Sequence, residues 1–316
     1  MAIKRMKLKV NPKSLKIKRE INAGLDELNI FDMGTLLQFE THSWQARKNL
    51  PKKIASLLTP KAEKEWVRAT KSLIDRSYLQ DINSTISEAR AFVWEASLPF
   101  PIKGIHFIPN DRVNLIKDIL EGYISKLKKD VNEFSKQYKK YIKEAESELG
   151  IYKYFDPSDY PTDIRSKFNI SYRFFDLTIP SHINDDMRKE ELGKFKKLMG
   201  ETREMGILAL REGFSEIVTH LTDTLTGKLD GEKKRLSPKA IGKIDDFFTS
   251  FQSKNIFHDT ELESIIEKAK TIMEDITPED LRTDIDLTKV VHKQLGEVKT
   301  ELDKSIETFK RKVSFI

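Results

Sequence analysis

The chain contains no cysteine and little glycine, and both absences exclude classes of protein. Among its 316 residues there are no cysteines and 13 glycines. Without thiols the chain forms no disulfide, no thiolate zinc site and no cysteine nucleophile. Scarce glycine together with 34% charged residues is typical of long solvated helices and argues against a β-sandwich or a doubly wound sheet.

Long apolar runs are also missing. No stretch approaches the ~18 consecutive apolar residues that a membrane-spanning helix needs. Charged residues begin at Lys4 and no apolar segment follows them, which argues against a conventional signal peptide. The lack of cysteine fits a reducing compartment. We therefore expect a cytoplasmic protein that does not cross a membrane.

Catalytic motifs are absent from the sequence as well. None of the six histidines begins an H-E-x-x-H motif, and none has a glutamate three residues before it, as the helices of di-iron proteins require. No glycine-rich phosphate-binding motif occurs. Carboxylate pairs such as Asp185 and Asp186 fall at predicted helix starts, where the helix dipole favours negative charge. We predict no enzyme, no catalytic residue, no cofactor and no metal site.

The net charge of +6 is concentrated at the N-terminus. Residues 1–20 contain eight basic residues and one acid, so the remaining residues, with 48 basic and 49 acidic side chains, carry −1. This basic N-terminal arm could contact nucleic acid or an acidic partner, or could be a solvated tail. The candidate nucleic-acid contacts within it are Lys4, Arg5, Lys7 and Lys9.

Apolar residues at helical spacing predict a mainly α protein. One helix of about 40 residues is expected from Asn110 to Gly150, and a second from Asn184 to about Gly227. A Thr-Pro pair at residue 59 predicts an earlier helix that continues through Leu73 and Ile74. We expect an elongated bundle in which the two long helices lie antiparallel and bury their stripes against each other, as in a coiled coil. The regions expected after the arm are 21–182 and 183–316. Shorter helices are expected near residues 82–94 and 238–251. A capping box of Thr260 and Glu263 predicts the start of another, Thr277-Pro278 predicts the start of a short one, and a final helix is expected over 286–313.

One proline-bracketed stretch interrupts the helices, "SLPFPIKGIHFIPNDRV" from Ser97 to Val113. Prolines end the preceding helix, and Gly104 provides a bend, so we predict an extended loop or β-hairpin near residues 98–109. The apolar side chains here either pack over the bundle or dock on a partner protein. The candidate partner-binding residues in this loop are Pro99, Phe100, Ile105 and Phe107.

A second unusual stretch is "HSWQARKNLPKK", which lacks regular periodicity. Trp44 lies among basic residues here. Two roles stay open for its side chain, anchoring the core or binding a partner. Trp44, Arg47 and Lys48 are therefore additional partner-binding candidates.

Together these two stretches resemble an uncharacterised family found in bacteria and their phages. The shared pattern is a Trp-x-x-Arg-Lys-x-Leu stretch, a Leu-Pro loop with a following phenylalanine-proline turn, and a long coiled helix. It covers roughly residues 40–180. Trp44, Arg47, Lys48, Leu50, Leu98, Pro99, Phe107 and Pro109 carry the match.

Members of that family are often encoded beside a MoxR-type AAA+ ATPase and a von Willebrand factor A protein. The resemblance therefore implies a non-enzymatic scaffold or adaptor in ATP-driven remodelling, in a bacterial or phage-infected cell. It transfers no catalytic residue. Two alternatives stay open: a nucleic-acid-binding protein that uses the basic arm, and a helical pore-forming toxin component. Whether the chain forms a homo-oligomer also stays open.

Overall fold

The computed structural model describes residues 30–50, 68–151, 153–179, 184–229 and 238–313. In this part of the chain seven helices are present and 70% of the structure is helical, which confirms the mainly α prediction. The described residues also form a four-stranded antiparallel sheet and a two-stranded sheet.

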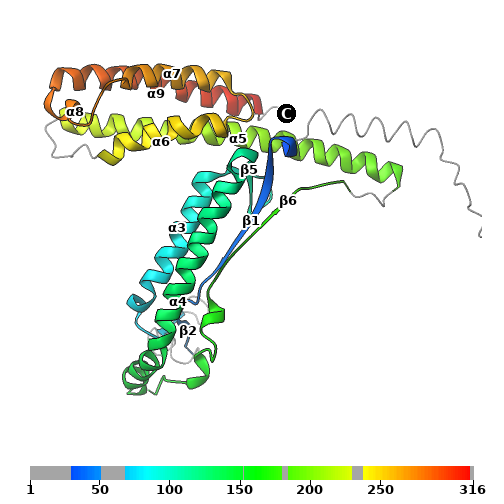
Figure 1. Ribbon diagram of the computed structural model, residues 1–316, viewed down its shortest axis with the longest axis vertical. Coiled ribbons are helices and arrows are strands. Elements are labelled where there is room, and N and C mark those ends of the chain that lie inside the picture. The colour runs from blue at the N-terminus through cyan, green and yellow to red at the C-terminus, as the bar shows by residue number, and fades with distance from the viewer. Residues whose placement is uncertain (1–29, 51–67, 152, 180–183, 230–237, 314–316) are drawn as a thin grey trace, which may run out of the picture. The chain divides into compact units, whose positions relative to one another are not determined.

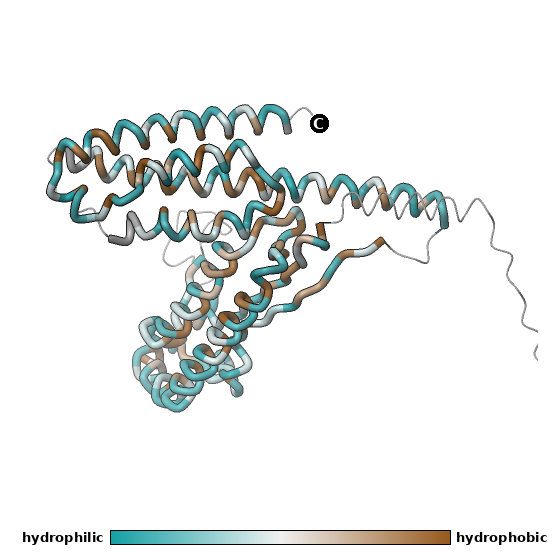
Figure 2. The backbone as a smooth tube through the Cα atoms, turned by 45° about the horizontal axis from the view of Figure 1, so that its top comes forward, coloured by the Kyte–Doolittle hydropathy of each residue, from teal (hydrophilic) through white to brown (hydrophobic). Residues whose placement is uncertain are grey.

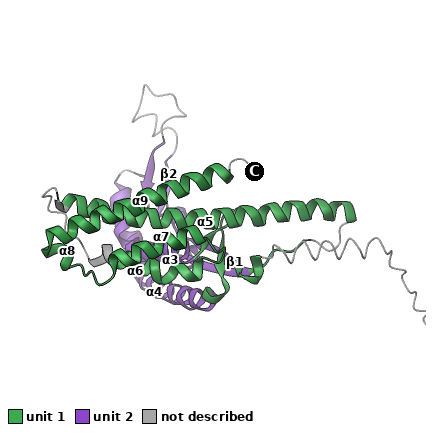
Figure 3. Ribbon diagram, turned by 90° about the horizontal axis from the view of Figure 1, so that it is seen from above, with its two compact units in different colours: residues 1–36, 97–112, 175–316 green, residues 37–96, 113–174 purple. Residues whose placement is uncertain are grey.

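The chain divides into two compact units, and neither is continuous in sequence (Figure 3). Unit 1 consists of Met1–Leu36, Ser97–Arg112 and Phe175–Ile316, whereas unit 2 consists of Leu37–Ala96 and Val113–Phe174. The regions expected from the sequence were continuous, with boundaries after residues 20 and 182.

Unit 1 is a helical bundle built on its longest helix, α5 (Figure 1). Arg211 on α5 donates a hydrogen bond to the carbonyl of Ser305 on α9 at 3.1 Å. Further along α5, Thr226 pairs with His292, which lies nearer the start of α9, so the two helices run antiparallel. The helices of unit 1 are α5 (Asp185–Leu229), α6 (Pro238–Lys254), α7 (Thr260–Met273), α8 (Asp280–Thr283) and α9 (Ile285–Val313).

Unit 2 contains α3 (Gln80–Ala96) and α4 (Val113–Gly150), which pack against each other. Their antiparallel pairing follows from the ion pair between Glu88 and Lys126 at 2.8 Å and from the ring contact between Phe92 and Tyr123. Figure 2 shows hydrophobic and hydrophilic residues alternating along the helices, as amphipathic helices require.

The four-stranded sheet has the order β4-β5-β1-β6. Strand β4 pairs antiparallel with β5, and the register places Leu98 opposite Phe107. Gly104, in the connection, has φ +79°, a conformation that glycine adopts without strain. This confirms the predicted hairpin. The strands are β4 (Leu98–Pro99), β5 (Ile105–Pro109), β1 (Gly34–His42) and β6 (Asn169–Phe175).

The predicted pairing of the two long helices is wrong. The apolar stripe of α4 lies in a core cluster with α3 and the segment after α4, whereas the stripe of α5 lies in a different cluster with α6, α7 and α9. An apolar stripe requires that something cover it but does not specify which element does so. The spacing therefore predicted both helices correctly and their partners incorrectly.

The predicted helix through Leu73 and Ile74 is also wrong in its last part. Residues Thr70–Ser72 form strand β3, which pairs with β2 (Arg47–Asn49). Leu73 and Ile74 are buried directly after this strand. The start of that predicted helix, at Thr59 and Pro60, lies outside the described residues.

Gly34, at the start of β1, tests the packing of the hairpin within unit 1. A Cβ atom added to Gly34 would lie 2.4 Å from the carbonyl oxygen of Ile108 and 2.5 Å from the ring of Phe107. We expect G34A to lower the free energy of unfolding by about 1–3 kcal/mol, because the clash involves backbone that cannot move freely.

The matched control for G34A is Gly122, an exposed position in α4 where an added Cβ atom meets nothing within 4 Å. Alanine favours helix, so G122A is expected to raise the free energy of unfolding by about 0.5–1 kcal/mol. Urea unfolding followed by circular dichroism measures both. Equal effects of G34A and G122A would contradict the close approach of β1 and β5.

Candidate partner-binding site

The aromatic residues of the hairpin lie inside unit 1. Phe107 is 0% exposed and Phe100 is 5% exposed, whereas Pro99 and Ile105 are half-buried. The ring centroids of Phe107 and Phe257 lie 6.4 Å apart. Packing over the bundle is therefore the correct interpretation for Phe107. Neither phenylalanine presents its side chain to a partner, because both are covered by their own unit.

Trp44, Arg47 and Lys48 lie in unit 2. Trp44 is half-buried and meets the ring of Tyr138 edge-on, with centroids 5.8 Å apart, so it anchors the core as well as reaching the surface. Arg47 and Lys48 are exposed residues of β2. In the β2–β3 register Lys48 stands opposite Lys71.

Two lysines opposite each other would repel, and Asp159 resolves this by binding both. The carboxylate of Asp159 forms ion pairs with Lys48 and, at 2.5 Å, with Lys71. Lys71 also donates a hydrogen bond to the carbonyl of Tyr154. Burial raises the pKa of Asp159, but the hydrogen bonds and charges of the two lysines outweigh burial and lower that pKa below its usual value.

The segment that follows α4 is thereby fastened to β3. The Asp159 side chain is 2% exposed, and the next residue, Tyr160, donates its hydroxyl to the carbonyl of Leu73 at 2.8 Å. Sequence reasoning missed both residues. The sequence "DPSD" was the available signal for this turn. Asp156 caps the turn Pro157–Asp159, because its side chain accepts a hydrogen bond from the backbone amide of Ser158.

We call the ion pairs of Asp159 with Lys48 and Lys71 the clamp. Beside the clamp lies a hollow of about 650 Å³ in the surface of unit 2. Two tyrosines line it, Tyr78 and Tyr141, whose rings stack with centroids 3.9 Å apart. The hydroxyl of Tyr78 donates to Glu144 at 2.8 Å. The full lining is Lys71, Ser72, Leu73, Ile74, Asp75, Tyr78, Tyr141, Glu144, Ala145, Ser147, Glu148 and Leu149. Sequence reasoning identified none of these residues as a site.

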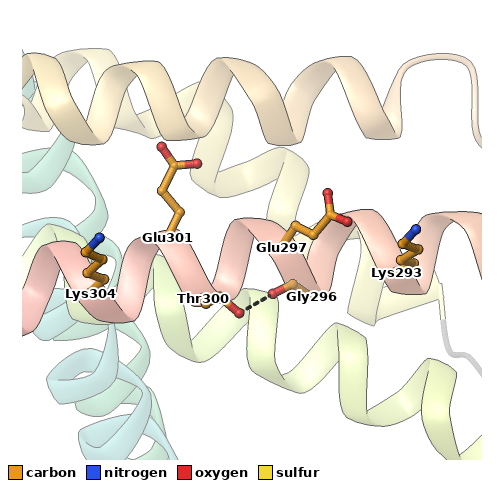
Figure 4. Close-up of a pocket in the computed structure, with 6 residues that line it drawn as sticks. All are labelled: Lys293, Gly296, Glu297, Thr300, Glu301 and Lys304. Atoms are coloured by element: carbon orange, nitrogen blue, oxygen red, sulfur yellow. Dashed lines mark hydrogen bonds between the residues drawn. The ribbon is translucent and has the colours of Figure 1, made fainter.

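A second hollow, of about 510 Å³, follows one face of α9 (Figure 4). All of its lining residues come from that single helix, and they carry both signs of charge: Lys293, Gly296, Glu297, Thr300, Glu301 and Lys304. Glu301 is already bonded to Lys268 of α7 at 2.7 Å. Figure 4 shows the hydroxyl of Thr300 donating to the carbonyl of Gly296. This face is a solvated helix surface and defines no ligand.

Unit 1 contains a buried ion pair between Arg211 and Asp259, whose side chains are 4% and 3% exposed. The Arg211 guanidinium binds both carboxylate oxygens of Asp259 at 2.7 Å and also binds Glu261 at 2.9 Å. It lies 5.0 Å from the ring centroid of Phe309. Because these groups already use its donors, Arg211 joins α5, α7 and α9 and is not a binding site.

Replacing Asp159 tests the clamp in unit 2. We expect D159N to lower the free energy of unfolding by about 1–3 kcal/mol, because it leaves the nearly buried ammonium of Lys71 without its anion. The matched control is D163N. Asp163 is exposed, and its side chain accepts the backbone amide of Arg165, which an asparagine side chain can also accept. If chemical denaturation gave the same small effect for both variants, the clamp would contribute nothing.

The clamp also predicts a dependence on pH. Because the pKa of Asp159 is lower in the folded chain than in the unfolded chain, its stabilisation is fully present above the unfolded value near 3.8. It is lost as the pH falls through the folded pKa. The difference in unfolding free energy between the natural chain and D159N should stay constant from pH 7 to about 4 and then narrow. A constant difference down to pH 2 would contradict this assignment.

Some predicted features lie outside the described residues, including Lys4, Arg5, Lys7 and Lys9 of the basic arm. Within the described ranges, no three His, Asp or Glu side chains are grouped so that they could hold a metal ion. None of the described helices is both long and apolar enough to cross a membrane. Comparison with protein families, curated proteins and solved structures finds no match for this chain.

Proposed function

We propose that the protein is a non-enzymatic helical scaffold or adaptor that works with a MoxR-type AAA+ ATPase and a von Willebrand factor A protein. The resemblance of the Trp44 and hairpin stretches to a family encoded beside such proteins suggests the partners. The feature of unit 1 that supports the proposal best is the N-terminal half of α5.

This half of α5 extends beyond the bundle of its own unit (Figure 1). The C-terminal turns of α9 reach α5 at Arg211 and Glu212, since Phe309 lies over Arg211 and Lys310 binds Glu212 at 2.6 Å. Residues Asp185–Glu204 of α5 lie beyond that point. We call this part the α5 arm.

The C-terminal turns of the arm are covered within unit 1, where Met199 is 1% exposed and the ring centroids of Phe31 and Phe195 lie 6.3 Å apart. The part N-terminal to Phe195 contains no buried residue, and a short helix has little stability on its own in water, so a partner that covers this part would stabilise it.

The α5 arm and the turn that follows it present two exposed methionines on one face. Met187 is 51% exposed and Met205 is 36% exposed. They are 18 residues apart (205 minus 187), which is five helical turns, so both side chains project in the same direction. Methionine adapts its shape to different partners and is common at surfaces that bind proteins. Charged neighbours such as Lys194, paired with Glu190 at 2.8 Å, keep the rest of the arm solvated.

Co-purification of the tagged full chain from its native host tests this proposal. We expect the ATPase and the von Willebrand factor A protein to be recovered with the natural chain, and we expect M187E/M205E to reduce their recovery at least tenfold. The control is V290E, which places one glutamate, against two in the double variant, at an apolar position of α9 that is 52% exposed. Circular dichroism should show unchanged helix content in both variants.

Two results would contradict the proposal. One is repeated recovery of the natural chain as a lone monomer. The other is equal loss of partners from M187E/M205E and V290E, which would mean that the α5 arm has no special part in binding.

A further inference from the structure

The hollow of unit 2 has an unbalanced charge. Three carboxylates line it, those of Asp75, Glu144 and Glu148, against one ammonium, that of Lys71. Lys71 shares the carboxylate of Asp159, which lies outside the lining, with Lys48. The hollow therefore presents excess negative charge to whatever enters it.

The carboxylates are also incompletely paired. Glu148 is exposed and forms no ion pair with any described residue. Asp75 accepts the backbone amide of Ser77, at 2.9 Å, and the side chain of the same serine, and pairs with no cation among the described residues. The nearest cation to Glu144 is the exposed Lys140, at the long distance of 3.7 Å. An exposed pair of this kind exchanges readily for a better one.

The tyrosines provide a flat aromatic surface beside these carboxylates. Tyr78 and Tyr141 stack within 14° of parallel, and both are half-buried, so parts of their rings face the hollow. The hydrogen bond to Glu144, burial, and the nearby charges of Glu144 and Asp75 raise the pKa of Tyr78.

We propose that this hollow docks an arginine side chain of a basic peptide segment belonging to a partner protein. A guanidinium is planar and stacks on an aromatic ring while its fork of N–H donors binds carboxylates, so it satisfies both features of the hollow at once. An ammonium is a compact point charge without a planar face to stack or a fork of donors for two carboxylates, so it fits the hollow less well. This proposal identifies the chemistry of a segment of the partner protein, so it rests on the proposed adaptor function.

The chain's own basic arm fits this chemistry less well. Of the eight basic residues in positions 1–20, six are lysines and two are arginines, Arg5 and Arg19. The preference of a stacked site for guanidinium favours a partner segment richer in arginine.

Fluorescence anisotropy with the full-length chain tests the proposal at low salt. The probes are three labelled peptides that alternate glycine with arginine, with lysine or with citrulline, the uncharged counterpart of arginine. We expect saturable binding of the arginine peptide, binding several-fold weaker for lysine and at least tenfold weaker for citrulline. The same affinity for arginine and citrulline peptides would overturn the proposal.

A matched pair of variants locates the binding. Glu148 lines the hollow, whereas Glu146 is an exposed residue of α4 that does not. E148Q and E146Q change the net charge equally and neither is expected to affect folding, because both side chains are solvated. We expect E148Q to weaken binding of the arginine peptide three- to tenfold and E146Q to leave it nearly unchanged. Equal weakening by both would show attraction to overall charge and would overturn the docking site.

A third variant distinguishes the partner segment from the basic arm. If R5Q/R19Q in the full-length chain bound the arginine peptide more tightly than the natural chain, the arm would be the natural occupant, and the assignment to a partner would be overturned. Unchanged affinity supports it. These measurements need no ATPase or von Willebrand protein, so their failure is distinguishable from a failure of the adaptor proposal in co-purification.

Discussion

Every part of this structure depends on covering the apolar stripes of two very long helices. Helices α4 and α5 contain 38 and 45 residues, and most helical stability comes from packing of the apolar face. In unit 2, α3 and the aromatic segment after α4 cover the stripe of α4. In unit 1, helices α6, α7 and α9 cover the stripe of α5. The short elements of each unit thus follow from the needs of its longest helix.

Besides its apolar packing, each unit contains a buried charged side chain that joins several of its elements. Arg211 joins three helices of unit 1 through Asp259 and Ser305, and Asp159 joins the two lysines of β2 and β3 in unit 2. Such groups are costly to bury unless all their bonds are made, so they specify one arrangement of elements that apolar contacts alone would leave open. In unit 2, Asp159 also positions β3 and the end of α4 around the acidic hollow.

The long helices were predictable from the sequence because they have periodic apolar residues, and the structure places α4 and α9 within a few residues of the expected bounds. The hairpin followed from its prolines and Gly104. The partners of α4 and α5 were not predictable, since a stripe encodes burial and not the covering element. Strand β1 was missed because its sequence, "GTLLQFETH", has no regular alternation. The hollow was missed because Tyr78 and Glu144 come from two distant segments that only tertiary packing brings together.

Helix α9 packs on α5 and α3 packs on α4, and the lack of native cysteine makes this pairing directly measurable. Introduced cysteine pairs can be joined with a short bifunctional thiol reagent in the folded chain. The account predicts efficient linkage for S215C/D303C, across α5 and α9, where the natural side chains lie 3.0 Å apart, and for E88C/K126C, across α3 and α4. Failure of both pairs, together with linkage of A145C to L210C on the two long stripes, would contradict it.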